Sequence, residues 1–291
     1  NITLNINGGT IYTGSIGGGR CKNSTGKIGS GTVKITSGTL HGQVVMGAGA
    51  GTNTFTMSGG KIDNSTSPYS DISQPFVFIE PNGGAVYMES GIAEISGGII
   101  QNCEAENGGA IFLDGGDFEM SGGEISNCYA DNNGGAIYVS GGDILMTSGI
   151  LEDNTAMDSG GAIFVESETI DVNITMESGY IRDNVAGLYG GAVGANLLGT
   201  SKCYITIGLY DCMCNHVELH DTNECPVIAN NIADISGGAF YCQSVGNTES
   251  TDIEDHILIV DLFCCNIYNN DALKYNGSNS LDEDNGYFTI Y

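Results

Sequence analysis

Basic residues are the scarcest charged class in this sequence. Eight Lys and Arg stand against 35 Asp and Glu, which gives a formal net charge of −27 at pH 7. Binding to nucleic acid needs clustered Lys and Arg, so that class of partner is excluded. Attraction to an anionic membrane is disfavoured for the same reason, and an acidic polysaccharide would be repelled unless a cation such as Ca²⁺ bridged it. The simplest consequence of the charge is high solubility.

The sequence also lacks tryptophan, contains only four prolines and has no uninterrupted run of 18 apolar residues. It therefore predicts no membrane-spanning helix, and no periodicity of 3.6 residues predicts an amphipathic one. No targeting peptide is visible, because residues 1–4 already read as a strand. Glycine is in excess instead, at 46 residues. Such an excess suits many tight corners between short strands.

One tetrad, Gly-Gly-Ala followed by an aliphatic or aromatic residue, occurs six times. Its first glycines, at 83, 108, 134, 160, 190 and 237, lie 25, 26, 26, 30 and 47 residues apart. A period in that range indicates a solenoid, in which each repeat is one rung that cannot bury its own apolar face. The six tetrads are Gly83–Val86, Gly108–Ile111, Gly134–Ile137, Gly160–Ile163, Gly190–Val193 and Gly237–Phe240.

A single repeat, residues 108–133, shows how a rung is built. Pairs of glycines separate three short segments, at 110–113, 117–121 and 124–127, that alternate or concentrate apolar residues as strands do. We therefore expect an all-β fold, a parallel β-helix with three short strands per rung and roughly ten rungs. It forms one domain over 1–291, from a strand at Ile2–Ile6 to one at Phe288–Ile290, with loop insertions near 65–82, 208–226 and 243–256.

Equivalent apolar residues recur in register from rung to rung. Alternation in the second strand predicts inward pairs separated by outward polar residues, and the third strand contributes one further inward column. The expected pairs are Val33/Ile35, Phe55/Met57, Ala93/Ile95, Phe118/Met120, Ile144/Met146, Ile174/Met176 and Ile205/Ile207, and the column is Leu40, Ile62, Ile100, Ile125, Leu151, Ile181 and Ile228.

A polar column follows the third strand. We expect its side chains to form a ladder of hydrogen bonds along the solenoid, as stacked amides do in cross-β structures. A Ca²⁺ ion between neighbouring carboxylates is the alternative, because Asp153 and Asp183 would otherwise repel one another. Beside this column runs a second one, Cys103, Cys128, Asn154, Asn184 and Asn231. The expected structural polar ladder is Asn102, Asn127, Asp153, Asp183 and Asn230, with Asn64 as an earlier member.

The cysteines leave two kinds of chemistry open. Cys103 and Cys128 lie one rung apart at equivalent positions. They are either two buried thiols or joined by a disulfide. A cluster of Cys and His in the longest insertion has the residue types and spacing of a Zn²⁺ site. We favour disulfides there, since Cys203 and Cys242 are near in sequence. The candidate metal ligands are Cys212, Cys214, His216, His220 and Cys225.

An aromatic column lies three residues after the second glycine of successive tetrads. If Ile111, Ile137 and Ile163 point into the coil, the neighbouring rings face outward and form a surface on which sugars could stack. If the register is reversed, the rings belong to the core. The candidate binding residues are Tyr87, Phe112, Tyr138 and Phe164, with Tyr241 as a further member.

At this point the repeat carries a resemblance. Repeated Gly-Gly-Ala-Ile with an Asn a few residues upstream, clearest between Gly83 and Tyr241, resembles the β-helical passengers of polymorphic outer-membrane proteins and related adhesin-like surface proteins. The resemblance implies a right-handed coil that is secreted or displayed on the cell surface, with an adhesive or structural role. The Phe-x-x-Asn motif of that family is not regular here. No catalytic residue is carried over.

These observations together predict an extracellular or cell-surface, adhesin-like or structural protein, which is not an enzyme and needs no cofactor. Its expected partner is a glycan or protein receptor, or a second copy stacked head to tail into a fibre, since uncapped solenoid ends expose strand edges. A polysaccharide-binding module is the alternative. A polysaccharide lyase or hydrolase is the remaining one, although no recognisable set of paired aspartates or of an Arg or Lys base is present.

Overall fold

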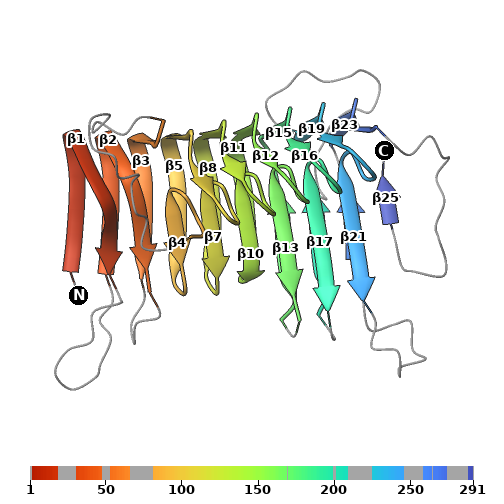
Figure 1. The fold of residues 1–291 in the computed structure, drawn as a ribbon, viewed down its shortest axis with the longest axis horizontal. Helices are drawn as coiled ribbons and strands as arrows, with labels where there is room; N and C mark the ends of the chain where they lie inside the picture. The colour runs from red at the N-terminus through yellow and green to blue at the C-terminus, as the bar shows by residue number, and fades with distance from the viewer. Residues whose placement is uncertain are drawn as a thin grey trace.

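The computed structural model describes residues 2–18, 31–47, 53–65, 81–168, 170–198, 201–208, 225–245, 258–263, 265–273 and 288–290. These residues form a single coil of strands that advances along one axis (Figure 1). Nineteen strands form one continuous sheet around the coil, and six two-residue strands form a second. Every pairing is parallel except one, so the expected parallel β-helix is confirmed.

Each rung contributes strands to the same faces. The first two faces are crossed by β1 (Ile2–Gly18), β2 (Gly31–Met46), β3 (Thr54–Asp63), β5 (Ile92–Gln101), β8 (Asp117–Ser126) and β11 (Ile144–Glu152), and then by the pairs β14 (Val172–Met176) and β15 (Tyr180–Arg182), β18 (Cys203–Ile207) and β19 (Val227–Ala229), and β22 (Leu258–Leu262) and β23 (Asn266–Tyr268). The ends of β1 and β2 continue onto the third face, which is then formed by β4 (Val86–Met88), β7 (Ile111–Asp114), β10 (Ile137–Gly141), β13 (Ile163–Ser167), β17 (Val193–Leu198) and β21 (Phe240–Val245).

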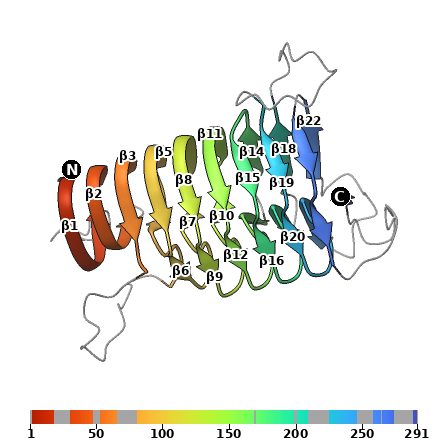
Figure 2. The ribbon, with the colours of Figure 1, turned by 90° about the horizontal axis from the view of Figure 1, so that it is seen from above.

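The second sheet lies along one edge of the coil, as Figure 2 shows. It consists of β6 (Glu104–Ala105), β9 (Tyr129–Ala130), β12 (Thr155–Ala156), β16 (Val185–Ala186), β20 (Ile232–Ala233) and β24 (Asp271–Ala272). In Figure 1 the near strands β13, β17 and β21 run downward while the chain advances from left to right, which is a right-handed coil. This is the hand that parallel crossover connections almost always take.

The rung differs from the predicted one in how its strands divide. Two of the three expected strands are a single strand in β8, because the Gly122–Gly123 corner bends the chain without ending the pairing to β5. A two-residue strand that the sequence did not indicate, residues 129–130 in this rung, follows the later turn at Asn127. Nine strands, β1, β2, β3, β5, β8, β11, β14, β18 and β22, stack on the first face, against the roughly ten rungs expected.

The strand predicted at 288–290 is present, and the third insertion begins a few residues later than predicted. The last strand, β25 (Phe288–Ile290), adds no further parallel rung, because it pairs antiparallel with residues 240–242 of β21. The third insertion does not begin at Gln243, because β21 continues to Val245 and pairs there with β17. The remaining residues of the three insertions lie mostly outside the described ranges.

The core is the predicted one. Ile100 pairs in register with Ile62 on one side and Ile125 on the other, and the column continues through Leu151 and Ile181. All of these side chains are buried, as are the inward pairs of the first face. Like side chains therefore meet one layer apart, so each rung buries its apolar side chains against the rungs before and after it.

The chain turns a corner after the second face of each rung. The conformation of this corner places the hydrogen-bonded ladder one residue later in the sequence than predicted. Asn102, Asn127, Asp153, Asp183 and Asn230 have φ between 53° and 57°, a left-handed conformation that Asn and Asp tolerate better than other side chains do. This turn directs their side chains away from the coil, and the next residue points inward. The predicted ladder at these five positions is therefore wrong. They are corner residues, although Asn102 donates to Asp63 of the rung before it at 3.0 Å.

The amide ladder is formed by the adjacent column, Asn154, Asn184, Asn231 and Asn270. Their side chains are 0–6 % exposed. The Nδ2 of each of the first three donates to the Oδ1 of the next at 2.9–3.0 Å, and that Oδ1 also accepts the backbone N–H of the preceding Asn at 3.0–3.1 Å. The side-chain amides thus form hydrogen bonds with both the backbone and the side chain of the neighbouring rung, which fixes the register of four successive rungs.

Candidate functional site

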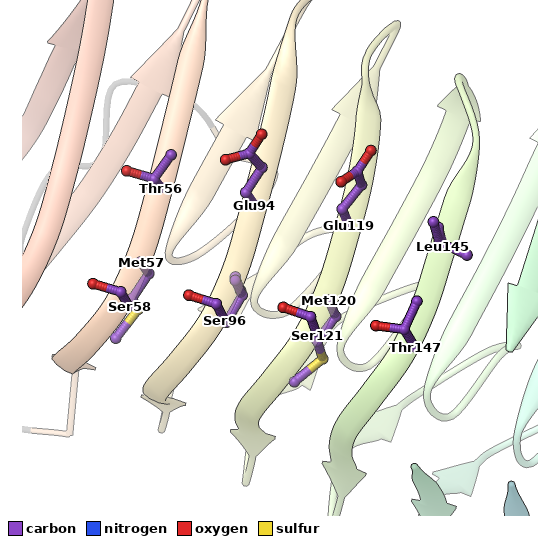
Figure 3. A pocket seen from close by; sticks show the side chains of 11 residues that line it. Thr56, Met57, Ser58, Glu94, Ser96, Glu119, Met120, Ser121, Leu145 and Thr147 are labelled. Atoms are coloured by element: carbon purple, nitrogen blue, oxygen red, sulfur yellow. The ribbon is translucent and has the colours of Figure 1, made fainter. Parts of the chain in front are cut away.

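A groove on the outer surface of the coil is a candidate binding site. It has a volume of about 350 Å³ and crosses β3, β5, β8 and β11 (Figure 3). None of its residues was a predicted site residue. The groove is lined by Thr56, Met57, Ser58, Glu94, Ile95, Ser96, Glu119, Met120, Ser121, Leu145 and Thr147.

Strand alternation sorts these residues into a buried floor and two outer rows. Met57, Ile95 and Met120 point into the core and are 1–2 % exposed. The residues before and after them in each strand point outward, so two rows run along the axis, as Figure 3 shows. One row is Thr56, Glu94, Glu119 and Leu145, which pair in register, and the other is Ser58, Ser96, Ser121 and Thr147.

Glycine keeps the groove open beside the serine row. Gly97 and Gly122 follow Ser96 and Ser121, and a Cβ on either would lie only 2.8–2.9 Å from a serine carbonyl oxygen of the preceding rung. No side chain can therefore occupy that position without moving the backbone. The pairing register also shifts at this column in successive rungs, on both sides of Ser58 and of Ser96. Irregular pairing of this kind is common next to binding sites.

The groove carries unpaired negative charge. Glu94 and Glu119 stand directly opposite one another on neighbouring strands, which are about 4.8 Å apart in parallel sheets. The ion pairs between described residues are Lys61–Asp63 and Arg182–Glu152, each at 2.7 Å, and neither includes a groove residue. Like charges directly opposite are destabilising, so the two carboxylates leave a local repulsion that a bound cation or donor would relieve.

The side chains that line the groove offer hydrogen bonds to a ligand. Its hydroxyls donate and accept hydrogen bonds, and its carboxylates accept them. The described residues contain no group of three or more His, Cys, Asp or Glu side chains that could hold a metal ion, at this groove or elsewhere. They also contain no helix with the length and apolar character of a membrane span.

The predicted aromatic column exists but is not an exposed surface. Tyr87, Phe112, Tyr138 and Phe164 are only 6–8 % exposed and form a second apolar cluster with Val45, separate from the core inside the coil. Successive ring centroids are 5.5, 4.9 and 5.5 Å apart. The rings do alternate with the inward residues as expected. The prediction that they offer a face for sugars is wrong, because each ring covers the next.

The turn before each strand also covers these rings. A Cβ on Gly160 would lie 2.8 Å from the Cβ of Phe164, so the Gly-Gly turn packs directly against its own strand. The column is interrupted at Gly194, which pairs with Phe164 on one side and Tyr241 on the other. Tyr189 supplies a ring at the preceding turn and stacks on Tyr241 at 4.2 Å. The aromatic column is therefore a structural element of the rod.

The predicted metal cluster falls mostly outside the described residues. Cys212, Cys214, His216 and His220 lie there, and Cys225 is buried. Two other cysteines of this region, Cys203 and Cys242, are thiols in the core, so the expected disulfides do not include them. Burial raises the pKa of both thiols, that of Cys242 to about 12.

Cys103 and Cys128 are buried thiols as well, which settles the alternative left open above. Each Sγ donates within its own corner, Cys103 to the carbonyl of Gln101 at 3.2 Å and Cys128 to that of Ser126 at 3.3 Å. A hydrogen bond with Cys128, together with burial, raises the pKa of Cys103 well above its usual value. The Cys103 thiol therefore stays protonated near neutral pH.

A buried polar cluster on the second face was missed by the sequence reasoning. Asp63 is 8 % exposed and accepts from Asn102, Ser65 and Gln101 at 3.0–3.1 Å as well as pairing with Lys61. Burial alone would raise the pKa of Asp63, but the bonds from Lys61, Asn102 and Ser65 outweigh it and hold the pKa well below its usual range. The Asp63 carboxylate is thus held by hydrogen bonds and an ion pair from neighbouring residues, which indicates a structural role.

No protein-family model, curated protein or solved structure matches this chain. The function must therefore be argued from the rod, its amide ladder and the groove.

Proposed function

We propose that this chain is the rigid rod of an adhesin-like, extracellular or cell-surface protein, and that it holds its long insertions at fixed positions for contact with a receptor. The observation that carries the proposal is the return to register after an insertion. In one rung β14 and β15 are joined by residues 177–179, and in the next β18 and β19 are joined by residues 208–226. Nevertheless Val227 pairs with Tyr180, and Ile228 with Ile181.

A scaffold that displays loops must accept a long insertion without losing the register of its strands. The rung before the insertion and the rung after it contribute the same buried columns, so the core continues unbroken across the insertion. Long insertions cost little in loop-closure free energy when the flanking strands are already fixed. Surface loops on a rigid framework are also where binding residues concentrate. The amide ladder and the aromatic column supply the rigidity.

The acidic surface supports an extracellular setting, since a charge of −27 opposes association with nucleic acid and with anionic membranes. Assembly head to tail into a fibre is the alternative structural role. It needs a free strand edge at the last layer, and β25 occupies the edge of β21 there. β25 therefore covers the edge of one face, so head-to-tail stacking would have to use the edges of β22 and β23.

The test replaces residues 208–226 by Glu-Ser-Gly, the linker found in the rung below. Similar variants shorten the other two insertions. We expect each purified variant to keep its β-sheet circular dichroism and its melting temperature within a few degrees, and binding to cell surfaces or to a glycan array to fall for at least one of them. Binding unchanged after removal of all three insertions would contradict display. Release of sugar products from a polysaccharide panel, with and without Ca²⁺, would replace the proposal by catalysis.

A further inference from the structure

The groove has a length and direction that suit a chain laid along the rod. It crosses four strands, and the serine and threonine hydroxyls recur once per rung (Figure 3). Rungs are separated by about 4.8 Å, so three steps span about 14 Å. A pyranose unit in an extended polysaccharide advances by nearly the same distance. One sugar would therefore meet one rung, and each rung presents one hydroxyl of the serine row.

The two rows select for a ligand rich in hydrogen-bond donors. Ser96 and Ser121 can donate or accept, whereas the ionised Glu94 and Glu119 only accept. All four of these side chains are exposed, and the floor between the rows is closed by core residues. Leu145 adds an apolar contact at one end, of the kind the C–H face of a sugar ring can cover. Hydroxyl groups along the ligand would bond to both rows.

The charge of the groove narrows the choice further. Glu94 and Glu119 face one another without a described basic partner, and the whole protein is strongly acidic. An acidic glycan would add to the repulsion between the two carboxylates, and a neutral glycan would not reduce it. An ammonium group carries three donors and a positive charge, so it can bond to both carboxylates at once. Charge-assisted bonds of this type are about twice as strong as neutral ones.

We propose that this groove binds an extended polysaccharide of amino sugars with free amines, whose ammonium groups lie against Glu94 and Glu119 and whose hydroxyls bond to the serine row. None of the residues that line the groove belongs to an insertion, so the proposal does not rest on the display role. A basic peptide is a different occupant. It would satisfy the carboxylates but would leave the repeated hydroxyls without matched partners.

The experiment measures binding of a β-1,4-linked glucosamine tetramer by calorimetry, at low and at physiological salt. The comparison ligands are the N-acetylated tetramer, a neutral glucose tetramer and tetralysine. The variant is Glu94→Gln with Glu119→Gln. The matched control is Glu104→Gln with Asp131→Asn, two exposed carboxylates elsewhere that remove the same charge. Circular dichroism checks that both proteins keep the native sheet signal.

We expect the glucosamine tetramer to bind best, and the groove variant to weaken it by about tenfold or more, since charge-assisted bonds are lost, while the control changes it less than about twofold. Replacing residues 208–226 should leave this binding intact, which separates the groove from the insertions. Equal binding of the acetylated tetramer, equal binding of tetralysine, or equal losses in variant and control would each overturn the proposal.

Discussion

Asn184 in the amide ladder offers the sharpest single perturbation of the rod. The side chain is fully buried and makes five hydrogen bonds. Its Nδ2 donates to Leu151 O, Arg182 O and Asn231 Oδ1 at 2.9–3.0 Å, and its Oδ1 accepts from the backbone and side-chain nitrogens of Asn154, both at 3.0 Å. The substitution Asn184→Ala removes all five.

The expected loss in the free energy of unfolding depends on which hydrogen-bond partners of Asn184 are left unpaired. The N–H of Asn154 and the carbonyls of Leu151 and Arg182 lose a bond in a buried setting, while Asn231 Oδ1 still accepts the backbone N–H of residue 184. A buried group left unsatisfied costs about 1–3 kcal/mol. Allowing for relaxation, we expect Asn184→Ala to lower the free energy of unfolding by about 3–5 kcal/mol.

The matched control is Asp183→Asn, at the exposed corner next door. Asn tolerates the φ of 57° found there, so the control should change stability by less than about 0.5 kcal/mol. Urea denaturation followed by circular dichroism measures both, with the slope examined because solenoids can unfold in parts. A loss below about 1 kcal/mol for Asn184→Ala, or similar losses in both proteins, would refute the role assigned to the ladder.

Two further predictions concern the corners and the thiols. Gly134 has φ of 70°, and a Cβ there would lie 2.4 Å from Ile137 O, so Gly134→Ala should cost at least about 2 kcal/mol in urea denaturation. Gly141→Ala, whose Cβ would meet its nearest atom at an ordinary 3.6 Å, should stay within about 1 kcal/mol, and equal effects would contradict the account. Cys242 has a folded pKa of about 12 against 9.0 for the ordinary thiol, so its contribution to stability is complete below pH 9 and is lost as pH rises toward 12. Urea midpoints at pH 8 and pH 11 should show the decline in the wild type and a smaller one in Cys242→Ala, and equal declines would sink this assignment.

The sequence predicted the apolar columns well because period-two alternation leaves little freedom of register. Ile100, Ile125 and Leu151 pair as expected, since a slip of one residue would turn each to the solvent. The polar ladder was missed by one residue because a left-handed corner interrupts the alternation. A signal was present: Asn127 and Asp153 are residue types that tolerate positive φ, and they recur where the chain must turn.

The site was harder to predict. Burial of Phe112 and Phe164 depends on rings one layer away and on turns that fold back, and alternation alone describes neither. The groove depends on small side chains followed by glycines in successive rungs. Its sequence signal is the recurrence of Glu-x-Ser-Gly-Gly at 94–98 and 119–123, which reads as an ordinary corner until the rungs are stacked.

The central claim is that rungs stack in register at a constant spacing. Nitroxide labels attached through unnatural ketone side chains at Lys34, Leu145 and Thr206 test it by pulsed electron resonance, because these outward positions share one column. Four rungs separate the first pair and six separate Lys34 from Thr206, so backbone separations of about 19 and 29 Å are expected. Distances that do not grow in this ratio, or that both exceed about 40 Å, would contradict the β-helix on which every inference above depends.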